Sequence, residues 1–153
     1  MIDTHCHLNF DAYDDDREQV VERAHAAGVR QIIIPGIDGQ TNPAVVELTQ
    51  RYDGVYAAVG IHPNSTASAT PEDLAAVKRL AQDNVRVIAI GEIGLDYHWD
   101  KSPRTVQHDM LRAQLDLAAQ LNLPVILHNR ESGYDLMAIL EDWVAGHGEG
   151  FHD

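Results

Sequence analysis

Five ionisable side chains end or directly follow short apolar segments of this sequence: His5, His7, Glu92, His128 and His152. Imidazole nitrogens and carboxylate oxygens are the ligands that zinc and related hydrolytic metals take in proteins. Each histidine alone is explained as well by a satisfied core residue. Together they predict a mono- or dinuclear metal site that performs hydrolysis.

The first pair forms the tripeptide His5-Cys6-His7. Side chains two residues apart on a strand point the same way, so both imidazoles can face one ion. Cys6 then faces the opposite side, and we expect it to be a small packing residue. On its own the pair is weak evidence, because two incidental polar residues give the same pattern.

Glu92 stands between Gly91 and Gly94, directly after an apolar segment. A carboxylate placed after a buried strand is costly unless a partner compensates its charge. Two cations that share the carboxylate would supply that partner. A helix cap or an ion pair is the simpler alternative.

Three further residues are candidates for substrate contact: His62, His98 and Arg130. His62 follows an apolar segment and could be a ligand, a hydrogen-bond donor to the transition state or a loop residue. His98 lies in the segment after Glu92. Arg130 lies two residues past His128, and its planar guanidinium group suits phosphate.

The segments that carry these residues alternate between two patterns. Continuous, β-branched apolar runs, typical of parallel strands buried on both faces, cover residues 1–2, 31–35, 55–60, 85–90, 124–128 and, weakly, 150–152. Helix patterns between them cover about 15–27, 42–52, 71–82, 103–122 and 132–146. Thr70-Pro71 and Ser102-Pro103 each predict an N-cap followed by proline at the first helical position. The alternation predicts an α/β fold with a parallel sheet.

Two α/β architectures compete. A doubly wound nucleotide-binding sheet is weakened because neither a Gly-x-Gly-x-x-Gly turn nor a phosphate-binding Walker loop is found. Polar residues at the carboxyl ends of nearly every strand favour a TIM-type (β/α)₈ barrel. We count five strand–helix units and the start of a sixth strand, whereas a full barrel takes roughly 250 residues. The prediction is therefore a single, partial barrel domain over residues 1–153.

Composition narrows the function. The chain has 11 basic and 24 acidic residues, a formal net charge of −13. This argues against broad electrostatic binding of nucleic acid, but a metal site with a few local cations could still act on it. The single cysteine fits a reducing cytoplasm. We expect no signal peptide and no contact with membrane, since no apolar stretch approaches the roughly 20 residues of a spanning helix.

These residues resemble the TatD-related metal-dependent hydrolases of the amidohydrolase superfamily. The resemblance runs along essentially the whole chain, and its motifs are residues 1–9, 60–63, 91–97, 102–104 with Gln107, and 124–130. It implies a cytoplasmic TIM-type barrel that hydrolyses phosphodiester bonds in DNA with divalent metal, usually as a 3′→5′ exonuclease. Mixed ligation permits Zn, Mn, Ni or Mg.

The resemblance also implies roles for single residues. His5 and His7 match ligands of one metal, and Glu92 matches a carboxylate shared by two metals. His128 and His152 match ligands of the second metal. Glu92 is thus the only residue to which the resemblance gives a catalytic role.

One departure bears on activity. The family's late Glu-Thr-Asp motif, whose aspartate ligates metal and positions the attacking water, is not found in these 153 residues. Two alternatives therefore stay open. One is a truncated or half-barrel chain that binds metal without turnover, self-associates or needs a complementary C-terminal segment. The other is a different amidohydrolase, although that branch commonly bridges its metals with a carbamylated lysine where this chain has Glu92.

Overall fold

One parallel sheet of five strands organises the protein, with the strands in chain order. The computed structural model describes residues 1–99 and 101–147. The strands are β1 (Ile2–Asp3), β2 (Gln31–Pro35), β3 (Val55–Val59), β4 (Val87–Asp96) and β5 (Val125–Arg130). The helices are α1 (Arg17–Ala26), α2 (Thr41–Arg51), α3 (Pro71–Asp83), α4 (Arg104–Leu121) and α5 (Gly133–His147). Short 3-10 turns cover Asp11–Tyr13 and Pro63–Ser65.

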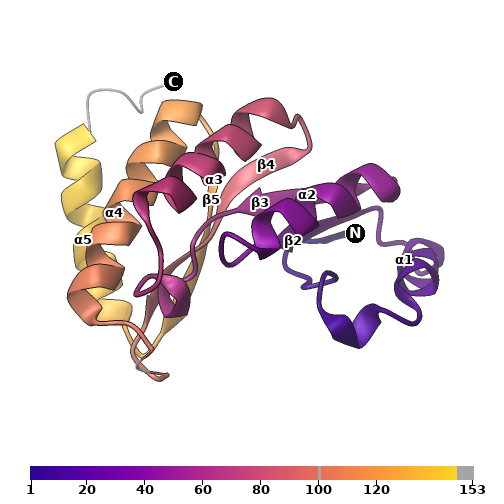
Figure 1. Ribbon diagram of the computed structural model, residues 1–153, viewed down its shortest axis with the longest axis horizontal. Coiled ribbons are helices and arrows are strands. Elements are labelled where there is room, and N and C mark those ends of the chain that lie inside the picture. The colour runs from indigo at the N-terminus through magenta and orange to yellow at the C-terminus, as the bar shows by residue number, and fades with distance from the viewer. Residues whose placement is uncertain (100, 148–153) are drawn as a thin grey trace.

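The helices between the strands cover one face of the sheet. Figure 1 shows α2, α3 and α4 side by side along it, with α1 and α5 at opposite ends. A parallel sheet whose strands follow chain order and curl beneath helices is a half-barrel, so the predicted α/β class is confirmed. The predicted sixth strand, residues 150–152, lies outside the described residues.

Strand β4 is longer than the sequence predicts. The apolar pattern places a strand over residues 85–90, but β4 continues to Asp96 and is buried from Ala89 onward. Its register against β5 shifts between Ile90 and Ile93, so the strand pairing is irregular there. The prediction ended the strand too early because the apolar run stops at Ile90, whereas β4 continues through Gly91 and Gly94. Glu92 therefore lies within a strand.

Gly94 shows why glycine is needed in this strand. Its φ is +145°, a conformation that L side chains rarely adopt, and a Cβ there would overlap the carbonyl oxygen of His128. Because Gly94 pairs with His128 across β4 and β5, the missing side chain lets the two strands approach. The close approach brings His128 beside Glu92.

The helix starts follow local hydrogen bonds. Thr70 caps α3, since its Oγ1 accepts from the Asp73 N–H at 3.3 Å while Asp73 Oδ2 accepts from the Thr70 N–H at 2.8 Å. The predicted cap at Ser102 was wrong. Pro103 occupies that position without a side-chain cap, and Ser102 Oγ instead accepts from the N–H of Ala67.

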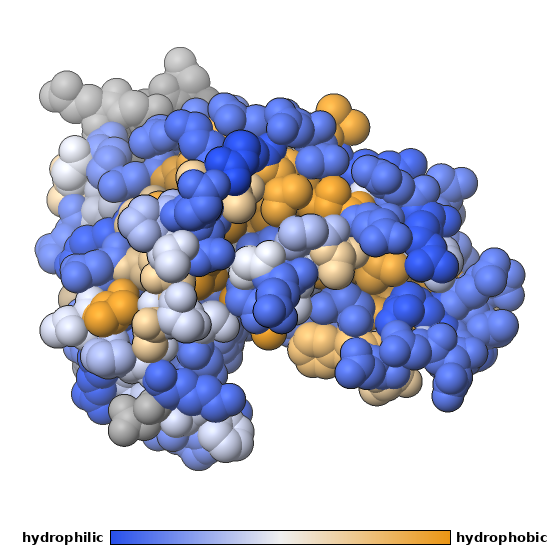
Figure 2. Space-filling view, in the orientation of Figure 1, coloured by the Kyte–Doolittle hydropathy of each residue, from blue (hydrophilic) through white to orange (hydrophobic). Residues whose placement is uncertain are grey.

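The core lies between the sheet and helices α2, α3 and α4, and its centre includes Ile34, Val59, Ile90, Leu95 and Leu111, none more than 1% exposed. Figure 2 shows mainly hydrophilic side chains over the helices, with apolar ones visible between them. Among residues 1–99 and 101–147, no helix is long and apolar enough to cross a membrane. The cytoplasmic location stays a prediction.

Candidate metal centre

His5 and His7 converge on one oxygen of Glu92. Their Nε2 atoms lie 3.3 Å apart, and Glu92 Oε2 lies 3.3 Å from His5 Nε2 and 3.6 Å from His7 Nε2. The pair does not close the first strand as predicted, because β1 ends at Asp3. The Cys6 N–H, which donates to the Ile33 carbonyl at 3.1 Å, ties the segment to β2. Cys6 itself packs against the core, as expected.

The other oxygen of Glu92 faces a different imidazole. Glu92 Oε1 lies 2.7 Å from Nδ1 of His128 on the neighbouring strand. Only 8% of the Glu92 side chain is exposed. One buried carboxylate thus divides its two oxygens between the His5–His7 pair and His128.

A second group of ligand types adjoins the first. Its members are His62, Asp96 and His128, whose ligand atoms all lie within 4.8 Å of one another. His128 Nε2 lies 3.1 Å from Asp96 Oδ2, and the His62 ring meets the His128 ring edge-on at 4.3 Å between centroids. His62 Nδ1 accepts from the Asn64 N–H, which leaves its Nε2 for another partner.

Asp96 is the member that the sequence analysis missed. Its side chain is fully buried. Oδ1 accepts hydrogen bonds from the backbone N–H groups of His98 at 3.0 Å and Trp99 at 3.1 Å. Oδ2 accepts a hydrogen bond from Asn64 Nδ2 at 3.1 Å. Asp96 stands four residues after Glu92. Had the strand been predicted to continue, the even spacing would have placed both carboxylates on one face.

Burial and the surrounding charges set the protonation of these groups. Burial raises the pKa of Glu92, but His128, His7 and His5 outweigh it and leave that pKa well below its ordinary value. Hydrogen bonding to Glu92 raises the pKa of His128, although burial opposes the rise. Burial, and then the charge of His128, lower the pKa of His62 to about 4. His62 is therefore neutral near pH 7, the form in which imidazole binds metal.

The first group fits a tetrahedral ion. Zinc takes nitrogen and oxygen ligands at about 2.0–2.1 Å, so two such ligands lie about 3.3–3.4 Å from each other. The three separations among His5, His7 and Glu92 are 3.3, 3.3 and 3.6 Å. A cavity of about 270 Å³ opens beside them, lined in part by His7, His62, Glu92 and Lys101. The donor set and its spacing therefore fit a divalent metal.

The three residues predicted to contact substrate differ in their distance from this centre and in their exposure. His62 lies in it. His98 is partly exposed, with Nδ1 2.9 Å from Glu131 Oε1. Arg130 ends β5 and is exposed. The predicted ligand His152 lies outside the described residues.

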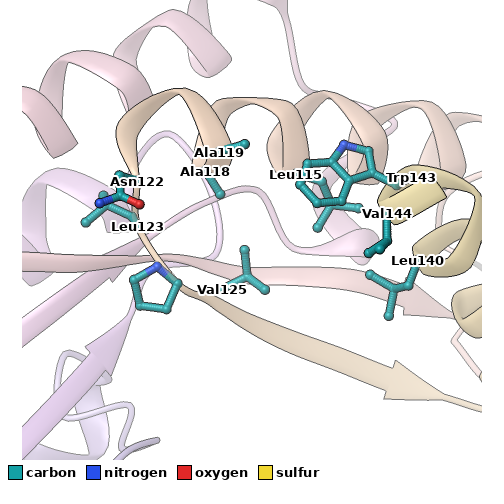
Figure 3. Close-up of a pocket in the computed structure, with 10 residues that line it drawn as sticks. Leu115, Ala118, Ala119, Asn122, Leu123, Val125, Leu140, Trp143 and Val144 are labelled. Atoms are coloured by element: carbon teal, nitrogen blue, oxygen red, sulfur yellow. The ribbon is translucent and has the colours of Figure 1, made fainter. Parts of the chain in front are cut away.

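A larger cavity lies apart from the candidate metal centre. It measures about 440 Å³ and lies between α4, the start of β5 and α5 (Figure 3). Its lining, which includes Leu115, Val125, Leu140 and Trp143, holds no ionisable side chain in the described part of the chain. The described lining of the cavity therefore offers neither an imidazole nor a carboxylate as a metal ligand.

Fold and site together define a barrel-type α/β protein whose candidate metal centre includes Glu92 of β4, His128 of β5 and the histidines that follow β1. The model of the family described as TatD related DNase matches residues 2–152, and the chain belongs to that family.

Similar proteins include metal-dependent hydrolases and an exonuclease. The chain is 46% identical to the uncharacterized metal-dependent hydrolase YabD of Bacillus subtilis, over 93% of this chain and 55% of that protein. It is 33% identical to the 3′-5′ ssDNA/RNA exonuclease TatD of Cronobacter sakazakii, over 94% and 54%. The crystal structure of YjjV, a TatD homologue from Escherichia coli, superposes with a TM-score of 0.87 at 35% identity, covering 94% of this chain and 56% of the other. The chain spans about half the length of these relatives.

Proposed function

We propose that this chain carries the metal centre of a phosphodiesterase that hydrolyses DNA with two divalent ions. The observation that carries the proposal is the division of the Glu92 carboxylate, with Oε2 toward His5 and His7 and Oε1 toward His128. A carboxylate shared in this way suits two ions about 3.5–4 Å apart, the arrangement of many phosphodiester hydrolases.

The ligands divide into two sets. His5, His7 and Glu92 would hold one ion, and Glu92, His128 and the predicted ligand His152 would hold the other, with His62 and Asp96 adjoining. When bound, such ions lower the pKa of a water molecule and stabilise charge on the attacking and leaving oxygens. Zn, Mn, Ni and Mg all remain compatible with these donors.

The remaining side chains would bind and orient the substrate. Lys101 lines the cavity beside Glu92, and Arg130 ends the neighbouring strand, so both can receive a phosphate group. His62 Nε2 is placed to meet a phosphoryl oxygen or a ligand. No residue of this sequence is proposed as the base that receives the proton of the attacking water.

The substrate class is taken from the relatives. The protein of Cronobacter sakazakii is named a 3′-5′ ssDNA/RNA exonuclease. We therefore propose single-stranded DNA, cleaved from its 3′ end, as the first substrate to test, with RNA of the same sequence beside it.

The test is metal analysis combined with hydrolysis of a labelled oligonucleotide. The purified chain is expected to bind two equivalents of Mn²⁺ or Zn²⁺, and Glu92→Ala is expected to bind at most one. Any hydrolysis should fall at least 100-fold with Glu92→Ala, the scale of losing a group that stabilises the transition state. Glu47→Ala, which removes an exposed carboxylate from α2, is the matched control.

Two outcomes decide against the proposal. Hydrolysis that survives both chelation and Glu92→Ala would exclude the metal mechanism. Two-metal binding without any hydrolysis would favour the alternative of a metal-binding chain without turnover.

A further inference from the structure

Trp99 is a large aromatic side chain on the surface beside the candidate metal centre. It follows the last residues of β4, and 56% of it is exposed. Tryptophan is enriched at surfaces that bind partners, because its ring offers a large apolar area together with a polar N–H. The exposed ring beside the candidate metal centre is therefore a candidate contact for a ligand.

Cationic side chains surround the Trp99 ring. Lys101 Nζ lies 6.0 Å from the ring centroid, and the Arg130 guanidinium carbon lies 5.9 Å from it. The two residues come from different segments, one from the approach to α4 and one from the end of β5. In a chain of net charge −13, this places two cations around one exposed aromatic surface.

Contacts with His98 and Asp96 hold the segment that carries the Trp99 ring. The His98 ring meets the Trp99 ring edge-on at 4.9 Å, and His98 Nδ1 lies 2.9 Å from Glu131 Oε1. The backbone N–H of Trp99 also donates to Asp96 Oδ1. Asp96 contacts His128, so the Trp99 segment is tied to the candidate metal centre through one buried carboxylate.

Lys101 connects the ring to the cavity. The same side chain that lies beside Trp99 also lines the cavity of about 270 Å³ that contains His7 and Glu92. A nucleic-acid strand whose backbone entered this cavity would therefore pass Lys101 and reach the Trp99 ring.

We propose that Trp99 stacks on an unpaired nucleobase of the substrate, while Lys101 and Arg130 hold the phosphates that flank that base. This inference rests on the proposed function and adds the residue that selects single strands. Every base has an aromatic face, so one indole ring accepts all four bases. A paired base inside a duplex is already stacked on both faces and cannot also cover Trp99.

Intrinsic fluorescence tests the contact directly. The chain has two tryptophans, so Trp143→Phe leaves Trp99 as the only one. In EDTA, which prevents cleavage, a single-stranded oligonucleotide is expected to quench Trp99 fluorescence. An oligonucleotide of equal length without bases keeps the phosphates but is expected to leave the fluorescence nearly unchanged.

Affinity measurements separate stacking from a structural role. By anisotropy of a labelled strand, Trp99→Ala should weaken binding of the normal oligonucleotide about tenfold, which is within the range of one stacked base. Binding of the abasic strand should stay unchanged, and Trp99→Phe should restore most of the loss. Lys101→Ala should weaken both strands equally. Trp143→Phe, which removes the tryptophan between α4 and α5, is the control.

Three results would overturn the inference: no quenching by the normal strand, equal quenching by the abasic strand, or equal loss of both affinities in Trp99→Ala. None of these depends on hydrolysis. Base binding through Trp99 without metal-dependent cleavage would support this inference and refute the proposed function. Metal-dependent cleavage without base binding through Trp99 would support the proposed function and refute this inference.

Discussion

At the scale of single residues, Asp96 orients His128 from the side opposite Glu92. His128 Nε2 meets Asp96 Oδ2 at 3.1 Å while Nδ1 meets Glu92 Oε1 at 2.7 Å. A carboxylate behind an imidazole fixes both the tautomer and the ring plane of a metal-binding histidine. Two backbone N–H groups and Asn64 hold that carboxylate in turn.

Asp96→Asn should therefore weaken metal binding without removing Glu92. We expect a loss of about 10- to 100-fold in metal affinity, the usual effect of losing such a supporting carboxylate. Competition with a chromogenic chelator measures it. Asp109→Asn, which changes an exposed carboxylate on α4, is the control. Equal affinity in both variants would show that Asp96 does not orient the site.

The sequence indicates which residue types meet but not every member of the cluster. His5, His7, Glu92 and His128 could be predicted because, taken together, they place metal-ligand types beside several apolar runs. Asp96 and Asn64 could not, because their role depends on the continuation of β4 and on the turn after β3. Trp99 gave no signal, since exposure of a large ring is a property of the folded surface.

At the scale of elements, the approach of β4 and β5 sets the distance between Glu92 and His128. Gly94→Ala should disturb that distance, because the added Cβ meets the backbone of His128 and the φ of +145° is strained for alanine. We expect a loss of about 2 kcal/mol or more in the free energy of unfolding. Denaturant titration measures it.

Gly146→Ala is the matched control for that substitution. Apart from its chain neighbours and the nearby backbone of its own helix, no atom lies within 4 Å of the position of its Cβ. Gly146 lies in α5, where alanine is favoured over glycine. The control should be neutral or slightly stabilising. If Gly94→Ala were equally harmless, close packing between β4 and β5 would not be what requires glycine.

The start of α3 gives a prediction about pH. Hydrogen bonds from the Thr70 side chain and then its backbone lower the pKa of Asp73 from its ordinary 3.8. The charged carboxylate therefore stabilises the fold above about pH 3.8, and this contribution is lost as pH falls through the lower folded value. Asp73→Asn should lower the thermal midpoint at pH 7, and the difference from wild type should shrink near pH 3.

Thr70→Ala removes the same cap from the other side. It should cost about 1 kcal/mol at pH 7, the usual effect of losing a threonine N-cap. Thermal unfolding of both variants at the two pH values gives the comparison. A difference for Asp73→Asn that stays constant down to pH 3 would show that the cap does not depend on the charge.

The elements themselves could largely be predicted because local signals and packing agree. The helix beginning at Pro71 has a cap, a proline and acids in its first turn, and it forms where expected. The end of β4 could not be predicted because glycine is common in turns and also where two strands lie very close together. The sequence of β4 alone does not distinguish a turn from a continuing strand; the pairing with β5 does.

At the scale of the whole molecule, the sheet has two open edges. Strands β1 and β5 each pair with a single neighbour in the part of the chain that the structure describes. Ile2 on β1 is 53% exposed and Leu127 on β5 is 38% exposed. An edge strand exposes unpaired backbone N–H and C=O groups, so a strand of another chain can pair with it.

We therefore predict that the purified chain self-associates, because in such a sample the only available partner is a second copy. Light scattering after size exclusion should give a mass above the 16.9 kDa of one chain at micromolar concentration. Leu127→Lys should shift the mass toward that of one chain, since a charge on an edge strand opposes pairing. Val85→Lys, at a site 96% exposed and away from β5, should leave the mass unchanged. A wild-type chain that stays at 16.9 kDa across concentrations would show that these edges are not interfaces.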